Sequence, residues 1–191
     1  MRSFFVATVL LLAWCASTSV LAQERQSVWP KWGDRGVLEY SGSATLYYAS
    51  STGKDAKFEV DLYPNIGWFV ADGFQLGFGP IIGYSKQGDV DSTSLGVDVT
   101  PRYVFMRQSS IRPSVMLNAG FIHVSASQAG GSSVSETGIL FGAGPAIAIP
   151  FGDRDGHGHL NLGLAYRMTR LTDSKTTTHR IGLEIGVSFW E

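Results

Sequence analysis

From residue 36 onward, apolar side chains alternate with polar or small ones along the chain. Between Lys57 and Val70 the apolar residues stand at even positions, and after the Ala71-Asp72-Gly73 turn the alternation resumes as far as Tyr84. A repeat of two residues is typical of a strand with one apolar face, whereas a helix repeats every 3.6 residues. The periodicity therefore predicts an all-β fold.

Eight segments carry this alternation, and each has roughly the 9 to 15 residues that a tilted strand needs to cross a bilayer. The connections near 71–73 and 107–110 are tight, and 150–158 is somewhat longer. Those near 49–56, 86–93, 126–135 and 171–177 are richer in Ser, Thr, Gly and Lys, which predicts modestly longer loops at the other end. The rows of apolar residues lie within 38–48, 58–70, 74–84, 95–105, 111–121, 139–149, 160–168 and 181–189.

The composition indicates whether the predicted sheet is exposed to water or to lipid. The chain is 44% hydrophobic and only 16% charged, whereas about a quarter of the residues of a soluble protein are charged. After the first 22 residues, no segment has the ~20 continuous apolar residues of a membrane helix. A membrane protein of this kind must be a closed barrel, because only helices and barrels satisfy their backbone hydrogen bonds in lipid.

The first 22 residues have the pattern of a secretory signal peptide, with Arg2, an apolar run from Phe4 to Trp14, and Val20-Leu21-Ala22 as the cleavage site. The only cysteine, Cys15, lies in this segment, so a disulfide is not expected. We expect a signal peptide over 1–22, a periplasmic N-terminal segment over 23–35 and a barrel domain over 36–191. Residues 29–32, Trp-Pro-Lys-Trp, fit either a periplasmic anchor or a flexible tail.

The non-apolar face of the expected strands is mostly Gly, Ala, Ser and Asn, which suits the narrow interior of an eight-stranded barrel. Its charges comprise five acidic and five basic residues, and a closed interior requires such a balance because a lone buried ion is costly. We therefore expect interior ion pairs among Glu39, Lys57, Glu59, Asp61, Asp98, Arg102, Arg112, Arg167, Arg180 and Glu184.

Aromatic residues gather near both ends of the expected strands, as in the interfacial girdles of membrane barrels. The expected girdle residues are Tyr48, Trp68, Phe74, Tyr84, Phe105, Phe189 and Trp190. Prolines at 64, 80, 101, 113 and 145 fall on the apolar face inside these strands, where each removes a hydrogen-bond donor from the ladder. A symmetric turn at Asp72 would place Pro64 directly opposite Pro80.

Two segments carry a resemblance to a known family. Residues 63–73, Tyr-Pro-Asn-Ile-Gly-Trp-Phe-Val-Ala-Asp-Gly, and residues 181–189, Ile-Gly-Leu-Glu-Ile-Gly-Val-Ser-Phe, resemble the small outer-membrane β-barrel proteins of the OmpA and OmpX type. The ending is similar to the C-terminal strand signal read by the barrel assembly machinery, although this chain continues to Trp190 and Glu191. The resemblance implies an integral outer-membrane protein of a double-membraned bacterium.

One group of residues has the composition of a catalytic device. His123 and Ser125 are two apart on a strand, with Glu136 across the next loop, and they faintly resemble the His-x-Ser pair of lipid A deacylase barrels. A polar strand end is the better interpretation, because nothing fixes a base within reach of the nucleophile. Asp153, Asp155, His157 and His159 could bind a divalent metal, but a solvated turn is commoner, and no metal or cofactor is expected.

These observations favour an eight-stranded antiparallel up-and-down transmembrane β-barrel with a closed polar interior and a structural or surface-interaction role. A large pore is not expected, because porin lumens need about 16 strands. The expected partners are outer-membrane lipids and the barrel assembly machinery, and the expected state is a monomer. The net charge of −1 excludes a nucleic-acid binder held by a basic surface. A lipid-modifying enzyme and a soluble lipocalin-like carrier with inverted faces remain as alternatives.

Overall fold

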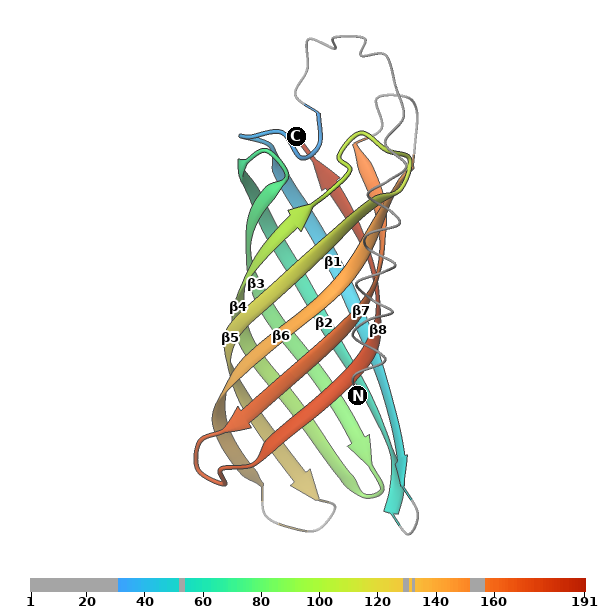
Figure 1. Ribbon diagram of the computed structural model, residues 1–191. Coiled ribbons are helices and arrows are strands. Elements are labelled where there is room, and N and C mark those ends of the chain that lie inside the picture. Colours follow the sequence, from blue (N-terminus) through green and yellow to red (C-terminus); the bar gives the residue numbers. More distant parts are fainter. Residues whose placement is uncertain (1–30, 52–53, 129–130, 132, 152–156) are drawn as a thin grey trace, which may run out of the picture. The chain divides into compact units, whose positions relative to one another are not determined.

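The computed structural model describes residues 31–51, 54–128, 131, 133–151 and 157–191, which form one closed antiparallel barrel (Figure 1). Consecutive strands pair with one another, and β1 pairs with β8 to close the sheet. The predicted eight-stranded up-and-down barrel is confirmed. The strands are β1 (Leu38–Ser51), β2 (Lys54–Ala71), β3 (Phe74–Gln87), β4 (Val90–Val104), β5 (Arg112–Gln128), β6 (Val134–Phe151), β7 (Gly158–Leu171) and β8 (Thr177–Trp190).

The barrel has two unlike ends. Residues 31–37, the C-terminus, the β2–β3 and β4–β5 connections, the end of β6 and the start of β7 lie at one end, which we call the proximal end (Figure 1). The β3–β4 and β7–β8 connections, the end of β1, the start of β2, the end of β5 and the start of β6 lie at the distal end. The expected signal peptide and residues 23–30 lie outside the described residues.

The expectation of longer loops at the distal end is wrong. The segment near 86–93 is mostly strand, because β3 and β4 pair without interruption down to Gln87 opposite Val90. Only residues 88 and 89 connect them, with Gly88 at a φ of 57°, a left-handed conformation that glycine adopts readily. The proximal β4–β5 connection, residues 105–111, is longer. Ser and Thr side chains leave the backbone free to pair, so this polar segment extends the sheet.

Three hydrogen-bond ladders are interrupted beside four of the in-strand prolines, but the register is the same on both sides of each gap. On β2 and β3, Leu62 pairs with Ile82 and Ile66 with Phe78, which places Pro64 opposite Pro80, as predicted, within an unpaired gap. The β4–β5 and β6–β7 ladders have similar gaps beside Pro101 and Pro145. The β-carbon of an alanine at position 79 would lie 2.0 Å from the Pro64 carbonyl oxygen, so the strands need glycine to approach closely here.

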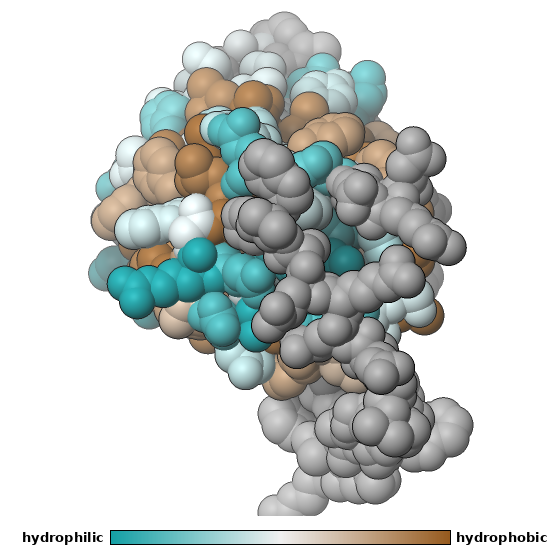
Figure 2. Space-filling view, turned by 90° about the horizontal axis from the view of Figure 1, so that it is seen from above, coloured by the Kyte–Doolittle hydropathy of each residue, from teal (hydrophilic) through white to brown (hydrophobic). Residues whose placement is uncertain are grey.

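The two faces of the sheet are sorted as the alternation predicts. Large apolar side chains on the outward face of every strand are exposed, from Leu46 on β1 to Ile181 on β8, which is 75% exposed. Figure 2 views the barrel from its proximal end and shows hydrophobic side chains around the wall. The inward face buries polar and charged groups, including Glu39, Asp61 and Arg167. Among the described residues there is no helix with the length and hydropathy needed to span a membrane.

Candidate functional site: the filled lumen

The proximal mouth of the barrel is filled by Trp32, whose side chain is only 1% exposed. Its ring packs edge-to-face on Phe69 at a centroid distance of 5.4 Å. Val37, Val104 and Ala148 complete the same buried apolar cluster. The chain therefore enters its own barrel before β1 begins, and residues 31–37 form a lid over the proximal mouth rather than a free tail.

Charged groups of the lumen hold this tryptophan from the other side. The indole Nε1–H of Trp32 donates to Glu39 Oε2, and the second carboxylate oxygen of Glu39 accepts from Arg102 Nη1 at 3.0 Å. The guanidinium carbons of Arg102 and Arg112 lie 5.2 and 5.1 Å from the indole centroid. Such contacts between a cation and an aromatic face are attractive and strengthen where water is excluded.

The backbone beside Trp32 is tied to the proximal turns. Gly73 N–H donates to the Gly33 carbonyl oxygen at 2.7 Å. Arg107, in the β4–β5 connection, donates to that same carbonyl at 3.1 Å and to Asp34 at 2.7 Å. Its other terminal nitrogen reaches Asp72 at 3.3 Å. One arginine thus joins the lid to two proximal turns.

A buried ion pair crosses the middle of the lumen. Arg167 Nη1 on β7 donates to Asp61 Oδ2 on β2 at 3.1 Å, and both side chains are almost fully buried. Tyr63 OH donates to the same carboxylate oxygen at 2.7 Å, and the Arg167 guanidinium carbon lies 4.0 Å from the Tyr63 ring centroid. Beside them, Tyr63 packs with Ile81, Ile122 and Leu140 in a second buried apolar cluster.

A third group of charges lies toward the distal end. Glu59 on β2 accepts from Arg180 on β8, and Lys57 Nζ lies 2.9 Å from its second carboxylate oxygen. One acid is therefore shared by two bases. The lumen is occupied at three heights, by Trp32, by the Asp61–Arg167 pair and by Glu59 with its partners.

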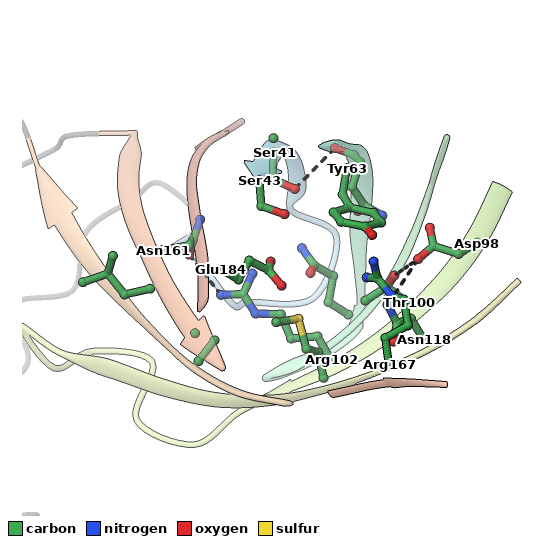
Figure 3. A pocket seen from close by; sticks show the side chains of 17 residues that line it. Ser41, Ser43, Tyr63, Asp98, Thr100, Arg102, Asn118, Asn161, Arg167 and Glu184 are labelled. Carbon is green, nitrogen blue, oxygen red and sulfur yellow. Dashed lines mark hydrogen bonds between the residues drawn. The ribbon is translucent and has the colours of Figure 1, made fainter. Parts of the chain in front are cut away.

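A cavity of about 80 Å³ lies inside the barrel wall, lined by residues of all eight strands (Figure 3). Arg102 and Arg167 reach it, and so do two acids, Asp98 on β4 and Glu184 on β8. Most of its other lining groups are hydroxyls and amides. They include Ser41, Ser43, Asn65, Gln75, Thr100 and Asn118.

The ten charged residues expected inside form fewer pairs than the sequence suggested. Ion pairs join Glu39 to Arg102, Asp61 to Arg167, and Glu59 to both Lys57 and Arg180. Arg112 instead contacts His159 Nε2 and the Trp32 ring. Within the part of the chain that the structure describes, no base pairs with Asp98 or Glu184. The expectation of ion pairing at these three residues is corrected, because the two arginines that line the cavity pair with Glu39 and Asp61 instead, and Arg112 lies against His159 and Trp32.

The candidate catalytic residues are only partly brought together. Ser125 Oγ lies 3.4 Å from His123 Nε2 on the outward face of β5. Glu136 belongs to the inward face of β6 and accepts from Ser174 Oγ at 2.8 Å. His123 therefore has no acid to orient it among the described residues, and the three do not form a triad.

The candidate metal ligands are also apart from one another. His157 contacts the carbonyl oxygen of Trp190, and His159 lies buried beside Trp32. Asp153 and Asp155 lie outside the described residues. Across the described ranges, no three His, Cys, Asp or Glu side chains are grouped to hold a metal by themselves.

Most expected girdle residues face outward. Trp68, Tyr84, Phe105 and Phe189 are exposed, and Phe74 is half-buried beside Tyr103. Trp190 is a correction: alternation from Phe189 turns it inward, where it packs against the proximal apolar cluster and His157. Tyr48 lies in β1, but its side chain is outside the described residues.

Comparison with known proteins was made by sequence and by structure. No protein-family model and no curated protein sequence matches the chain. Neisserial surface protein A is similar in structure, with 20% identity over 81% of this chain and 96% of its own and a TM-score of 0.57. OprG of Pseudomonas aeruginosa has 14% identity over 85% of this chain and 99% of its own and a TM-score of 0.51. The N-terminal β-barrel domain of OprF from the same organism has 15% identity, coverage of 82% and 98%, and a TM-score of 0.50. The fold is therefore that of the small eight-stranded outer-membrane β-barrels, as the two sequence segments implied.

Proposed function

We propose that this protein is an integral outer-membrane β-barrel with a structural or surface-interaction role, a closed polar interior and no large pore. The observation that carries the proposal is the distribution of side chains across the wall. Exposed apolar residues surround the barrel on all eight strands, whereas Glu39, Asp61, Arg102 and Arg167 are buried inside. A water-soluble protein places these two classes the other way round.

The width and filling of the lumen support the closed interior. An eight-stranded barrel is just wide enough for side chains to fill, and here they do so at three heights. A carrier of the lipocalin kind needs an apolar cavity, but hydroxyl, amide and charged side chains stand at 12 of the 17 positions that line the described cavity. Transport of a large solute through the lumen and storage of an apolar ligand are both disfavoured.

The outward face and the two ends of the barrel indicate which partners the protein would contact. The outward apolar face would contact outer-membrane lipids. The proximal end, where residues 31–37 and the C-terminus lie, would face the periplasm, because the chain reaches the membrane from that side and crosses it an even number of times. The four distal hairpins would then face outward and carry any surface contact. We propose that the barrel is a monomer, because eight strands close the sheet without a partner.

The C-terminal strand is the proposed contact for the barrel assembly machinery. β8 pairs with β1 through Tyr40 and Phe189, and Phe189 is exposed on the outward face. Phe189→Ala is expected to lower the amount of barrel assembled in cells, while Phe121→Ala, which removes another exposed phenylalanine, leaves it unchanged. Equal loss in both variants would count against a special role of this strand end.

The first experiment is electrophoresis of the outer-membrane fraction with and without boiling. A folded barrel that resists the detergent migrates differently from its unfolded chain, so a heat-dependent shift in this fraction is the expected result. Recovery of the protein from the periplasm in water without detergent would overturn the proposal. Such a result would mean that the protein is soluble and that its outward apolar face does not contact lipid.

A further inference from the structure

The junction between β1 and β8 is hydrogen-bonded over only part of its length. From the proximal end the two strands pair as far as Leu46 opposite Leu183, and Figure 1 shows them running apart toward the distal end. Every other ladder of the described sheet continues to the distal end of at least one of its strands. Residues 47–51 of β1 and 177–182 of β8 therefore border an opening in the wall, which we call the open seam.

The register indicates which backbone groups face the open seam. Leu38 and Glu191 exchange both of their N–H···O hydrogen bonds at 3.0 Å, and such pairs recur at every second residue of an antiparallel ladder. Beyond the last pair of the ladder, the next β8 groups directed toward β1 are the N–H and C=O of Ile181 and His179. A strand edge left unpaired beside lipid is costly. This edge therefore needs a hydrogen-bonding occupant.

The open seam lies where the apolar band of the wall ends. Leu183 and Ile181 are 64% and 75% exposed on the outward face of β8. The next outward positions toward the distal end are polar, with His179 and then Thr177. Given the lipid contact of the proposed function, the open seam begins among acyl chains and continues to the depth of the lipid headgroups.

Two bases and one acid lie beside the open seam on the inner side. Lys57 on β2 pairs with Ala49 of β1, and the register of β8 would bring Arg180 to the other side of Ala49 if the ladder continued. Both bases share Glu59, with Lys57 Nζ at 2.9 Å from it. The Lys57 and Arg180 side chains are 30% and 22% exposed, but that of Glu59 only 6%. Among the described residues, the seam therefore has accessible excess positive charge.

Arg180 also has hydrogen-bonding capacity to spare. Its Nη1 donates to Glu59, whereas its Nε is buried without a hydrogen-bond partner among the described residues. A guanidinium has five N–H donors in a planar fork that matches a phosphate, and a lysine ammonium has three donors. These groups favour an anion as the occupant. An extended peptide strand would satisfy the backbone edge but would leave the excess charge unbalanced.

We propose that the open seam binds the phosphate headgroup of one anionic membrane lipid. The Arg180 guanidinium and the Lys57 ammonium would bind the phosphate oxygens together with the backbone N–H groups of His179 and Ile181. The acyl chains would then lie along the exposed side chains of Ile181 and Leu183. The inference rests on the proposed function and names the kind of lipid that the wall holds. A lipid bound in this way completes the wall where β1 and β8 no longer pair.

The first test counts bound lipids by native mass spectrometry. The natural protein is refolded in uncharged detergent and mixed with bisphosphorylated lipid A, with phosphatidylglycerol or with uncharged diacylglycerol. We expect one retained anionic lipid per chain, no retained diacylglycerol, and weaker binding as NaCl is added, because salt screens the charges. Displacement of the lipid by inorganic phosphate at equal concentration would mean a site for free anions. A mass of two chains without lipid would mean that the edges of two copies pair. Either result overturns the inference.

Charge variants test the two bases. Glu59→Gln frees both bases from their acid and is expected to tighten lipid binding several-fold. Adding Lys57→Gln and Arg180→Gln to it removes both bases without stranding a buried acid, and should weaken binding at least tenfold relative to the natural protein. Lys86→Gln, which removes an exposed base from the distal end of β3, is the control and should bind as the natural protein does. A triple variant that binds as the natural protein does would refute the assignment.

The second test examines the open seam itself and needs no lipid. Cysteines at Leu46 and Leu183 should form a disulfide on oxidation, because facing residues of a ladder lie about 5.5 Å apart between Cα atoms and a disulfide spans about 4.4–6.8 Å. Cysteines at Tyr48 and Ile181, one step beyond the ladder, should stay reduced. Equal oxidation of both pairs would show that the seam is closed and would overturn the inference. The heat-dependent gel shift of the barrel does not depend on any of these results, so the proposed function stands or falls separately.

Discussion

Trp32 offers the sharpest test of the closed proximal mouth. Trp32→Ala removes a side chain that is 1% exposed, and large-to-small changes at fully buried aromatic positions cost about 3–5 kcal/mol. The change also removes the contacts with Arg102 and Arg112 and leaves Glu39 without its indole donor. We expect a loss at the upper end of that range.

A graded series identifies the source of the loss. Trp32→Phe keeps an aromatic ring against Phe69 but removes the hydrogen bond to Glu39, and a bond to a charged group contributes about 1.5–3 kcal/mol. Trp68→Ala deletes the same side chain from the outward face, where it is 53% exposed, and should cost less than Trp32→Ala because it leaves no cavity in the lumen. Far-UV circular dichroism against urea gives the three midpoints. A midpoint of Trp32→Ala equal to that of the natural protein would refute the lid.

Three further changes test other parts of the barrel. Leu183→Arg puts a charge on the outward face at mid-wall and should cost about 2–4 kcal/mol in lipid, and an unchanged urea midpoint would contradict the lipid-facing assignment. Gly79→Ala forces a β-carbon to 2.0 Å from a backbone oxygen and should cost about 1–3 kcal/mol of stability. Gly42→Ala is the control and should be tolerated, because nothing lies within 4 Å of the new β-carbon. Heat-dependent gel mobility compares the two variants. Arg167→Met strands a buried carboxylate and should cost about 3–5 kcal/mol, and the double variant with Asp61→Asn should regain much of this in a double-mutant cycle; no recovery would show that the pair is not coupled.

The sequence predicts the strands and their faces because both depend on local patterns. Alternation with a period of two fixes which side chains share a face, and the turn at 71–73 fixes one register from local symmetry. Pro64 and Pro80 therefore meet as predicted. The distal connections were misjudged because Ser- and Thr-rich composition resembles a loop even where the backbone pairs.

The partners inside the lumen could not be predicted in the same way. Alternation places Asp61 and Arg167 inside, but their contact joins residues 106 positions apart and depends on the stagger of the whole barrel. The same stagger leaves Asp98 without a base. Trp32 precedes the alternating rows, so no periodic signal indicated that its side chain enters the mouth.

The lumen is closed at three heights, by Trp32, by the Asp61–Arg167 pair and by Glu59 with its partners, and these three groups differ in chemistry. The difference determines how the barrel responds when one of them is removed. Trp32→Ala opens the proximal mouth, but Arg167 with Tyr63 still crosses the lumen and Arg180 with Glu59 lies beyond it. We therefore expect no ion current through Trp32→Ala barrels in planar bilayers, just as in the natural protein, even though the variant is less stable. A steady current through Trp32→Ala alone would show that the inner layers do not seal the lumen, and that a short N-terminal lid is the whole barrier.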